Sequence, residues 1–187
     1  MPTHLALLRG INVGGHHRLP MAQLRETVSG LGHTDVATYI QSGNVVFTAG
    51  AQRTPAGHAT TLREAIERGF GFAPVVVVRA AQEWADVVTA DPYPADVEPK
   101  TVHLAAQQEP VTADQRAVLE RLLREHQEAG GPDHLRVIGT TTYLHTPLGM
   151  GHSRLAERVA RVRGAGQDQA TARNRASAHR LLEMLSG

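Results

Sequence analysis

The chain reads VATYIQSGNVVFT over residues 36–48, and this stretch predicts a β-hairpin. Residues 36–40 and 44–48 are rich in β-branched and aromatic side chains, as is typical of strands, and Ser42-Gly43 between them forms turns readily. Before the hairpin, an apolar strand at residues 5–8 is followed by a helix with Met21, Leu24 and Val28 on one face.

After the hairpin we expect a polar loop over residues 49–59 and a helix that begins at a capping box of Thr61 and Glu64. A buried strand at residues 74–78 follows. The order β-α-β-β-α-β predicts an α+β fold whose N-terminal lobe, residues 1–92, is ferredoxin-like.

A proline-rich stretch at residues 91–99 predicts the boundary to a second, smaller α/β lobe over residues 100–187. There we expect a strand at 102–106, a helix with a capping box of Thr112 and Gln115, and strands at 135–138 and 143–145. A helix capped by Ser153 and a last helix from about residue 171 complete the lobe, which repeats β-α-β-β-α without a visible final strand.

Composition excludes several classes of protein. The 187 residues include no cysteine, so there is neither a disulfide framework nor a thiolate metal site. The net charge of +1 gives no overall attraction to nucleic acid. No apolar run approaches the roughly 20 residues that span a bilayer, and no signal peptide is visible, so we expect a cytoplasmic protein without a membrane partner.

Four polar clusters at the ends of predicted elements are candidates for an anion site. Three are rich in glycine or turn residues: the loop 9–15, the turn 41–44 and the loop 149–154, which leads into a helix N-terminus. The fourth, residues 171–174, begins the last predicted helix, where an arginine is electrostatically disfavoured unless it meets an anion. The candidate ligand-binding residues are Arg9, Asn12, Gly14, Gly15, Gln41, Ser42, Asn44, Gly151, Ser153, Arg154, Arg173 and Asn174.

Each cluster also has a purely structural interpretation, in which the glycines make turns and the hydroxyls cap helices. The loop at Gly10 is not a phosphate-binding P-loop, because His16-His17 stand where Lys and Ser or Thr are required. Adjacent histidines do not readily share one ion, so no metal site is predicted. No base–nucleophile pair is visible, so the catalytic residues and the cofactor are unknown from the sequence, and whether the protein is an enzyme stays open.

Residues 7–15 (LLRGINVGG) and 39–47 (YIQSGNVVF) resemble two characteristic stretches of the bacterial family called domain of unknown function 1697. The resemblance continues through residues 149–155 (GMGHSRL) and 171–174 (TARN). It implies a small bacterial α/β protein and carries no reaction, cofactor or substrate. The sequence departs from the family pattern at His16, Arg154, Ser177 and above all Arg175, which replaces an aromatic residue.

The leading hypothesis is that a small anion, phosphorylated or nucleotide-like, binds in a groove between the two lobes. Its basis is that glycine-rich backbone and arginine forks are hydrogen-bond donors, which gather around anions. One alternative is nucleic-acid binding by the basic C-terminal region through Arg154, Arg158 and Arg161 on a helix that buries Leu155, Val159 and Val162. Another is a protein-interaction module. The sequence predicts no oligomeric state.

Overall fold

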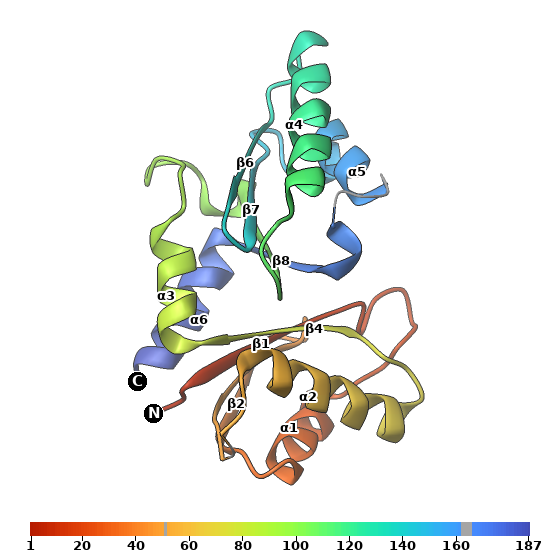
Figure 1. Cartoon of the computed structure of the whole chain (residues 1–187), viewed down its shortest axis with the longest axis vertical. Helices are drawn as coiled ribbons and strands as arrows, with labels where there is room; N and C mark the ends of the chain where they lie inside the picture. Colours follow the sequence, from red (N-terminus) through yellow and green to blue (C-terminus); the bar gives the residue numbers. More distant parts are fainter. Residues whose placement is uncertain (51, 162–165) are drawn as a thin grey trace. The chain divides into compact units, whose positions relative to one another are not determined.

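The protein is described by a computed structural model that places residues 1–50, 52–161 and 166–187 (Figure 1). The chain forms two compact units: unit 1 contains residues 1–86 and 179–187, and unit 2 contains residues 87–178. Each unit holds one four-stranded antiparallel sheet with helices, so the expected α+β class is confirmed. The domain boundary expected at residues 91–99 stays a prediction. Every helix in the described residues is too short or too polar to cross a lipid bilayer.

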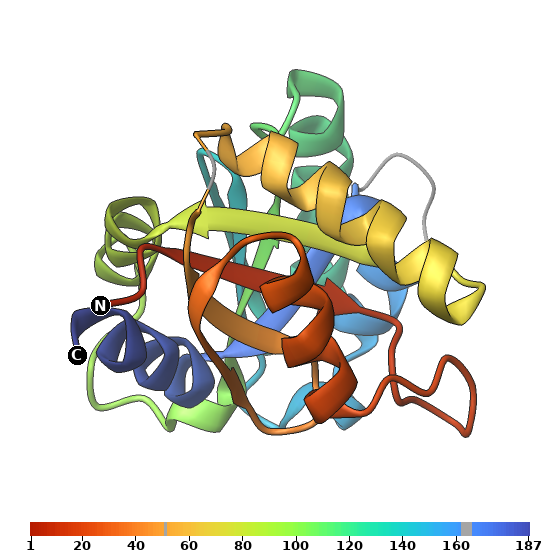
Figure 2. The ribbon, with the colours of Figure 1, turned by 90° about the horizontal axis from the view of Figure 1, so that it is seen from below.

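Unit 1 is built on strands β1 (His4–Arg9), β2 (Thr34–Tyr39), β3 (Asn44–Thr48) and β4 (Val75–Ala80), in the sheet order β2-β3-β1-β4. Helices α1 (Met21–Gly30) and α2 (Pro55–Phe70) lie on the same face of this sheet (Figure 2). Alternate strand residues such as Leu8 and Phe47 pack there against Leu24 and Ile66 of the helices. The period of two along strands and the apolar stripe of each helix therefore produce one core.

The start of α2 differs from the sequence prediction. The helix begins at Pro55, two turns before the expected Thr61, and Thr54 caps it by accepting a hydrogen bond from the Gly57 amide. Proline suits the first helical position because its missing N–H would have no partner there. The segment expected to be a polar loop therefore places His58 in the core.

Unit 2 contains β5 (Val102–Gln107), β6 (His134–Ile138), β7 (Thr141–His145) and β8 (Ala170–Asn174), in the sheet order β6-β7-β5-β8. Helices α4 (Ala113–Glu128) and α5 (Arg154–Arg161) share a core with Leu135 and Leu144 of the sheet. The capping box of Thr112 and Gln115 is confirmed at the start of α4. Short 3-10 turns, η1 (Pro99–Thr101), η2 (Met150–His152) and η3 (Gln167–Gln169), complete the connections.

The predicted helix start at residue 171 is wrong. Residues Ala170–Asn174 form strand β8, which pairs with β5 in register from His103↔Asn174 to Gln107↔Ala170. Helix α6 begins only at Arg175 and runs to Ser186. The final strand that the second lobe was expected to lack is therefore present.

With β8 in place, the two halves of the sequence have the same element order, β-α-β-β-α-β-α, in which α3 (Ala81–Thr89) and α6 stand last. The two sheets also have corresponding strand orders and registers. Leu5 pairs with Arg79 in unit 1 as Leu104 pairs with Arg173 in unit 2, and a histidine precedes each leucine. The weak sequence hint of an internal repeat is thus matched by topology.

Candidate functional site

The glycine-rich loop after β1 contains a tight turn of its own. Val13 and His16 form an antiparallel bridge, and Gly14 and Gly15 between them have φ of +60° and +79°. Positive φ at both central positions is the requirement of one common two-residue hairpin turn, which glycine meets without strain. The double glycine thus has a structural role.

Asn12 joins this loop to the turn that follows β2. Its Nδ2 donates to the carbonyl oxygens of Leu19, at 3.0 Å, and Gln41, at 3.1 Å, while its Oδ1 accepts from the Leu19 amide at 2.9 Å. The structure therefore brings together the first two predicted clusters, which are 29 residues apart at this contact. The side-chain amide of Asn12 is therefore already hydrogen-bonded to backbone groups of the protein.

The turn 41–44 is shaped by a buried asparagine. Asn44 Nδ2 donates to Tyr39 O at 3.1 Å and to Ser42 Oγ at 3.2 Å. Gly43 has φ of +75°, and a Cβ at this position would lie 2.7 Å from Leu8 Cβ. Of the predicted ligand-binding residues in this turn, Gln41 and Ser42 are the exposed ones.

The third cluster lies in unit 2 and ends in a buried polar network. Ser153 Oγ donates to Asp133 Oδ2 at 2.8 Å and accepts from the Ala156 amide at 2.9 Å, so the predicted cap of α5 is confirmed. His126 Nε2 lies 3.1 Å from the same Asp133 oxygen. The Ser153 hydroxyl is therefore engaged by protein groups, whereas Gly151 and Arg154 are exposed.

The fourth cluster is not a helix start, so the electrostatic reason given for Arg173 does not apply. Arg173 is a buried strand residue, and its Nη1 donates to Ala172 O at 2.7 Å. Burial lowers the pKa of its guanidinium to about 10, so the side chain remains charged at neutral pH. Asn174 Oδ1 accepts from the Ser177 amide at 2.8 Å and caps α6.

The basic C-terminal region is partly neutralised by acids. Arg158 on α5 forms an ion pair with Glu125, and Arg161 forms one with Glu157 at 2.9 Å. As expected, Leu155 and Val159 are buried, while Val162 lies outside the described residues. Paired arginines attract a polyanion less strongly than the charge of the sequence suggests.

Arg175 has a structural function in unit 2. Its Nε donates to Asp91 Oδ2 at 2.7 Å, and its Nη atoms donate to the carbonyl oxygens of Tyr93, at 3.0 Å, and Pro94, at 2.8 Å. Its side chain is only 7% exposed. Arg175 therefore fixes the proline-rich segment 91–97 from within.

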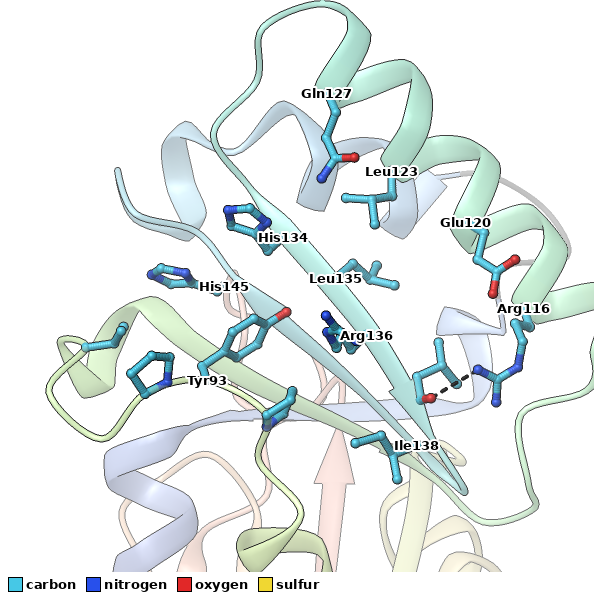
Figure 3. A pocket seen from close by; sticks show the side chains of 14 residues that line it. Tyr93, Arg116, Glu120, Leu123, Gln127, His134, Leu135, Arg136, Ile138 and His145 are labelled. Carbon is cyan, nitrogen blue, oxygen red and sulfur yellow. Dashed lines mark hydrogen bonds between the residues drawn. The ribbon is translucent and has the colours of Figure 1, made fainter.

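The fixed segment forms one wall of a pocket of about 780 Å³, whose other walls are α4, β6 and the end of β7 (Figure 3). β6 is an edge strand of the sheet. His134 of β6 is paired with His145 of β7, and both histidines line the pocket. The twelve candidate ligand-binding residues predicted from the sequence all lie in the described part of the chain, and none of them lines this pocket. The sequence signal for this site is the alternation of His134, Arg136 and Ile138 along β6.

The charged groups of the pocket are mostly basic. Arg116 and Arg136 face a single carboxylate, that of Glu120. Arg116 Nη1 donates to Val137 O at 3.0 Å, whereas the exposed Arg136 side chain makes no hydrogen bond or ion pair with the described part of the chain. Burial lowers the pKa of His145, and the neighbouring His134 lowers it further.

A row of rings lies beside these charges. The Tyr93 ring centroid is 5.3 Å from that of His145, and the His145 centroid is 6.1 Å from that of His134. Figure 3 shows Tyr93 and Arg136 among the side chains at this end of the pocket. The site thus combines permanently charged arginines with ring surfaces.

Unit 1 holds a second cluster of rings, but it is not arranged as a metal site. His4 and His33 lie 5.1 and 5.0 Å from His58, measured between ring centroids, beside Phe47. Within residues 1–50, 52–161 and 166–187, no group of three or more His, Asp or Glu side chains is placed to hold a metal ion.

Fold and site together define a small α+β protein with two topologically repeated units and a basic pocket in the second. The family described as "Protein of unknown function (DUF1697)" matches residues 1–143, and the chain belongs to this family. The match ends before residues 149–155 and 171–174, which also resemble the family in sequence.

The chain is similar to a solved structure, that of the conserved bacterial protein SP0830 from Streptococcus pneumoniae. The two share 21% sequence identity and superpose with a TM-score of 0.76 over 98% of each chain. At this identity the likeness shows the fold alone. No curated protein sequence matches the chain.

Proposed function

We propose that this protein binds a small anionic ligand, a phosphorylated or nucleotide-like molecule, in the pocket beside β6. The observation that carries the proposal is the excess of basic groups that line one open pocket. Arg116 and Arg136 outnumber Glu120, and His134 and His145 add further donors. A volume of about 780 Å³ is within the range of small-molecule sites.

Arg136 is the residue on which binding depends most. Its guanidinium makes no hydrogen bond with the described part of the chain. A planar guanidinium can donate two parallel hydrogen bonds to a phosphate or carboxylate group. Arg116 is held by its bond to Val137 O and supplies a second, better ordered charge.

Some contacts predicted from the sequence stay candidates for anion binding in their own units. In unit 1 these are Arg9, Gln41 and Ser42, and in unit 2 they are Gly151 and Arg154, all of them exposed. Arg9→Gln and Arg154→Gln test them separately from the pocket.

The test is a calorimetric titration with inorganic phosphate and pyrophosphate at pH 7 and low salt. We expect saturable 1:1 binding that Arg136→Gln weakens about tenfold or more, because hydrogen bonds to charged groups are worth about 1.5–3 kcal/mol. Arg124→Gln is the matched control, since Arg124 is exposed on α4 and does not line the pocket. Absence of binding, or equal affinity of the two variants, would contradict the proposal.

A further inference from the structure

We propose that the anion taken by this pocket is a nucleotide, whose base stacks on the Tyr93–His145 rings while its phosphate is held by Arg136. The inference rests on the proposed function and narrows its ligand class. It excludes sugar phosphates and other phosphorylated molecules without an aromatic group as the preferred ligands.

The first argument is that the Tyr93 ring is held rigidly. Its Oη donates to Tyr143 O at 3.2 Å, and its amide donates to Asp91 Oδ1 at 3.1 Å. Its own carbonyl oxygen accepts from Arg175 at 3.0 Å. Because both backbone and side chain are anchored, a ligand that packs on this ring does not have to immobilise it, and the entropic cost of binding is small.

The second argument is that the rings form a continuous surface at the pocket. Tyr93 and His145 are inclined at 49°, and His145 and His134 are nearly parallel at 16°. Leu123 and Ile138 also line the pocket with apolar groups, and Ile138 is 41% exposed. Bases of every kind stack on such side chains, whereas a sugar phosphate has no π-face to place there.

The third argument concerns charge. Burial raises the pKa of the Tyr93 hydroxyl well above its ordinary value, so this ring is neutral and does not repel a phosphate. Burial likewise lowers the pKa of His145 and favours its neutral form at pH 7. The Tyr93 and His145 rings are therefore uncharged at pH 7, and the permanent positive charges belong to the arginines. This separation matches a molecule with a neutral base at one end and an anionic phosphate at the other.

The experiment compares adenosine 5′-monophosphate, ribose 5-phosphate and adenosine as calorimetric ligands of the full chain. We expect the nucleotide to bind about tenfold more tightly than ribose 5-phosphate, in line with the contribution of one stacked base. Tyr93→Leu should remove this advantage and leave the affinity for ribose 5-phosphate unchanged, while Tyr93→Phe should keep most of it. Tyr39→Leu on β2 is the control for the loss of a tyrosine elsewhere.

Each outcome is decisive. If ribose 5-phosphate binds as tightly as the nucleotide, the inference fails and the proposed function stands. If neither binds, both fail. If the nucleotide is preferred but Tyr93→Leu retains that preference, the assigned stacking surface is wrong. Should Tyr93→Leu not fold, the comparison of ligands on the wild type and on Tyr93→Phe still decides the ligand class.

Discussion

Replacing Arg175 by methionine should destabilise unit 2 severely, because it leaves Asp91 as a buried charge without its partner. The two side chains are 7% and 9% exposed, and their ion pair measures 2.7 Å. Removing one member of a buried pair costs about 3–5 kcal/mol of unfolding free energy. The carbonyl oxygens of Tyr93 and Pro94 lose their donors as well, so we expect a value toward the upper end of this range.

The assay is urea denaturation at pH 7, followed by circular dichroism, of Arg175→Met, Asp91→Ala and the double variant. We expect the double variant to lose about 2 kcal/mol less than the sum of the single losses, since the two residues act as a pair. Arg180→Met is the matched control on the same helix, because its ion pair with Glu183 is exposed and should contribute at most about 1 kcal/mol. A loss for Arg175→Met as small as that of the control would refute the reasoning.

Three further predictions concern stability. Burial lowers the pKa of His58 to about 4 from its usual 6.5, and the nearby His4 and His33 contribute to this shift. The neutral His58 side chain therefore stabilises the fold fully above pH 6.5, and this stabilisation is lost as the pH falls toward 4. Urea denaturation at a series of pH values should show that this residue lowers the free energy of unfolding by up to about 3 kcal/mol as the pH falls. An unchanged dependence of stability on acid pH in His58→Leu would contradict this. Gly43→Ala should lower the melting temperature more than Gly139→Ala, since both have positive φ but only Gly43 would place a Cβ against Leu8; equal shifts would argue against the close approach. Ser153→Ala should cost about 2 kcal/mol in urea denaturation, from the lost cap and the lost donor to the Asp133 carboxylate, and a loss below about 0.5 kcal/mol would contradict the network.

Much of the fold is written locally in the sequence. The β2–β3 hairpin and the capping box at Thr112 follow from side-chain periodicity and from turn and capping chemistry, and both are found as expected. The start of α2 was also signalled locally, by Thr54-Pro55, which is a better start than Thr61 because proline occupies the first helical turn.

Strand β8 could not be found in the same way. Its five residues have no strong β-propensity and run directly into α6 at Arg175, so local pattern favours one helix. What makes the segment a strand is its pairing with β5, about 70 residues earlier in the chain, and such long-range pairing overrides local preference.

The candidate site shows the same limit. The glycine-rich segments are conspicuous in the sequence, yet Gly14, Gly15, Asn12 and Asn44 are largely explained by turns and backbone hydrogen bonds. The pocket draws instead on segments whose separate patterns look ordinary, and its wall depends on the distant Arg175. Only the fold brings these groups together.

The central claim is that a small anion binds beside β6, and amide chemical shifts measured by NMR during titration with inorganic phosphate test it most directly. The account predicts saturable shifts concentrated at His134, Arg136 and Tyr93 that are lost in Arg136→Gln. Shifts confined to the loop 9–15 or the turn 41–44, or an unchanged spectrum, would contradict it.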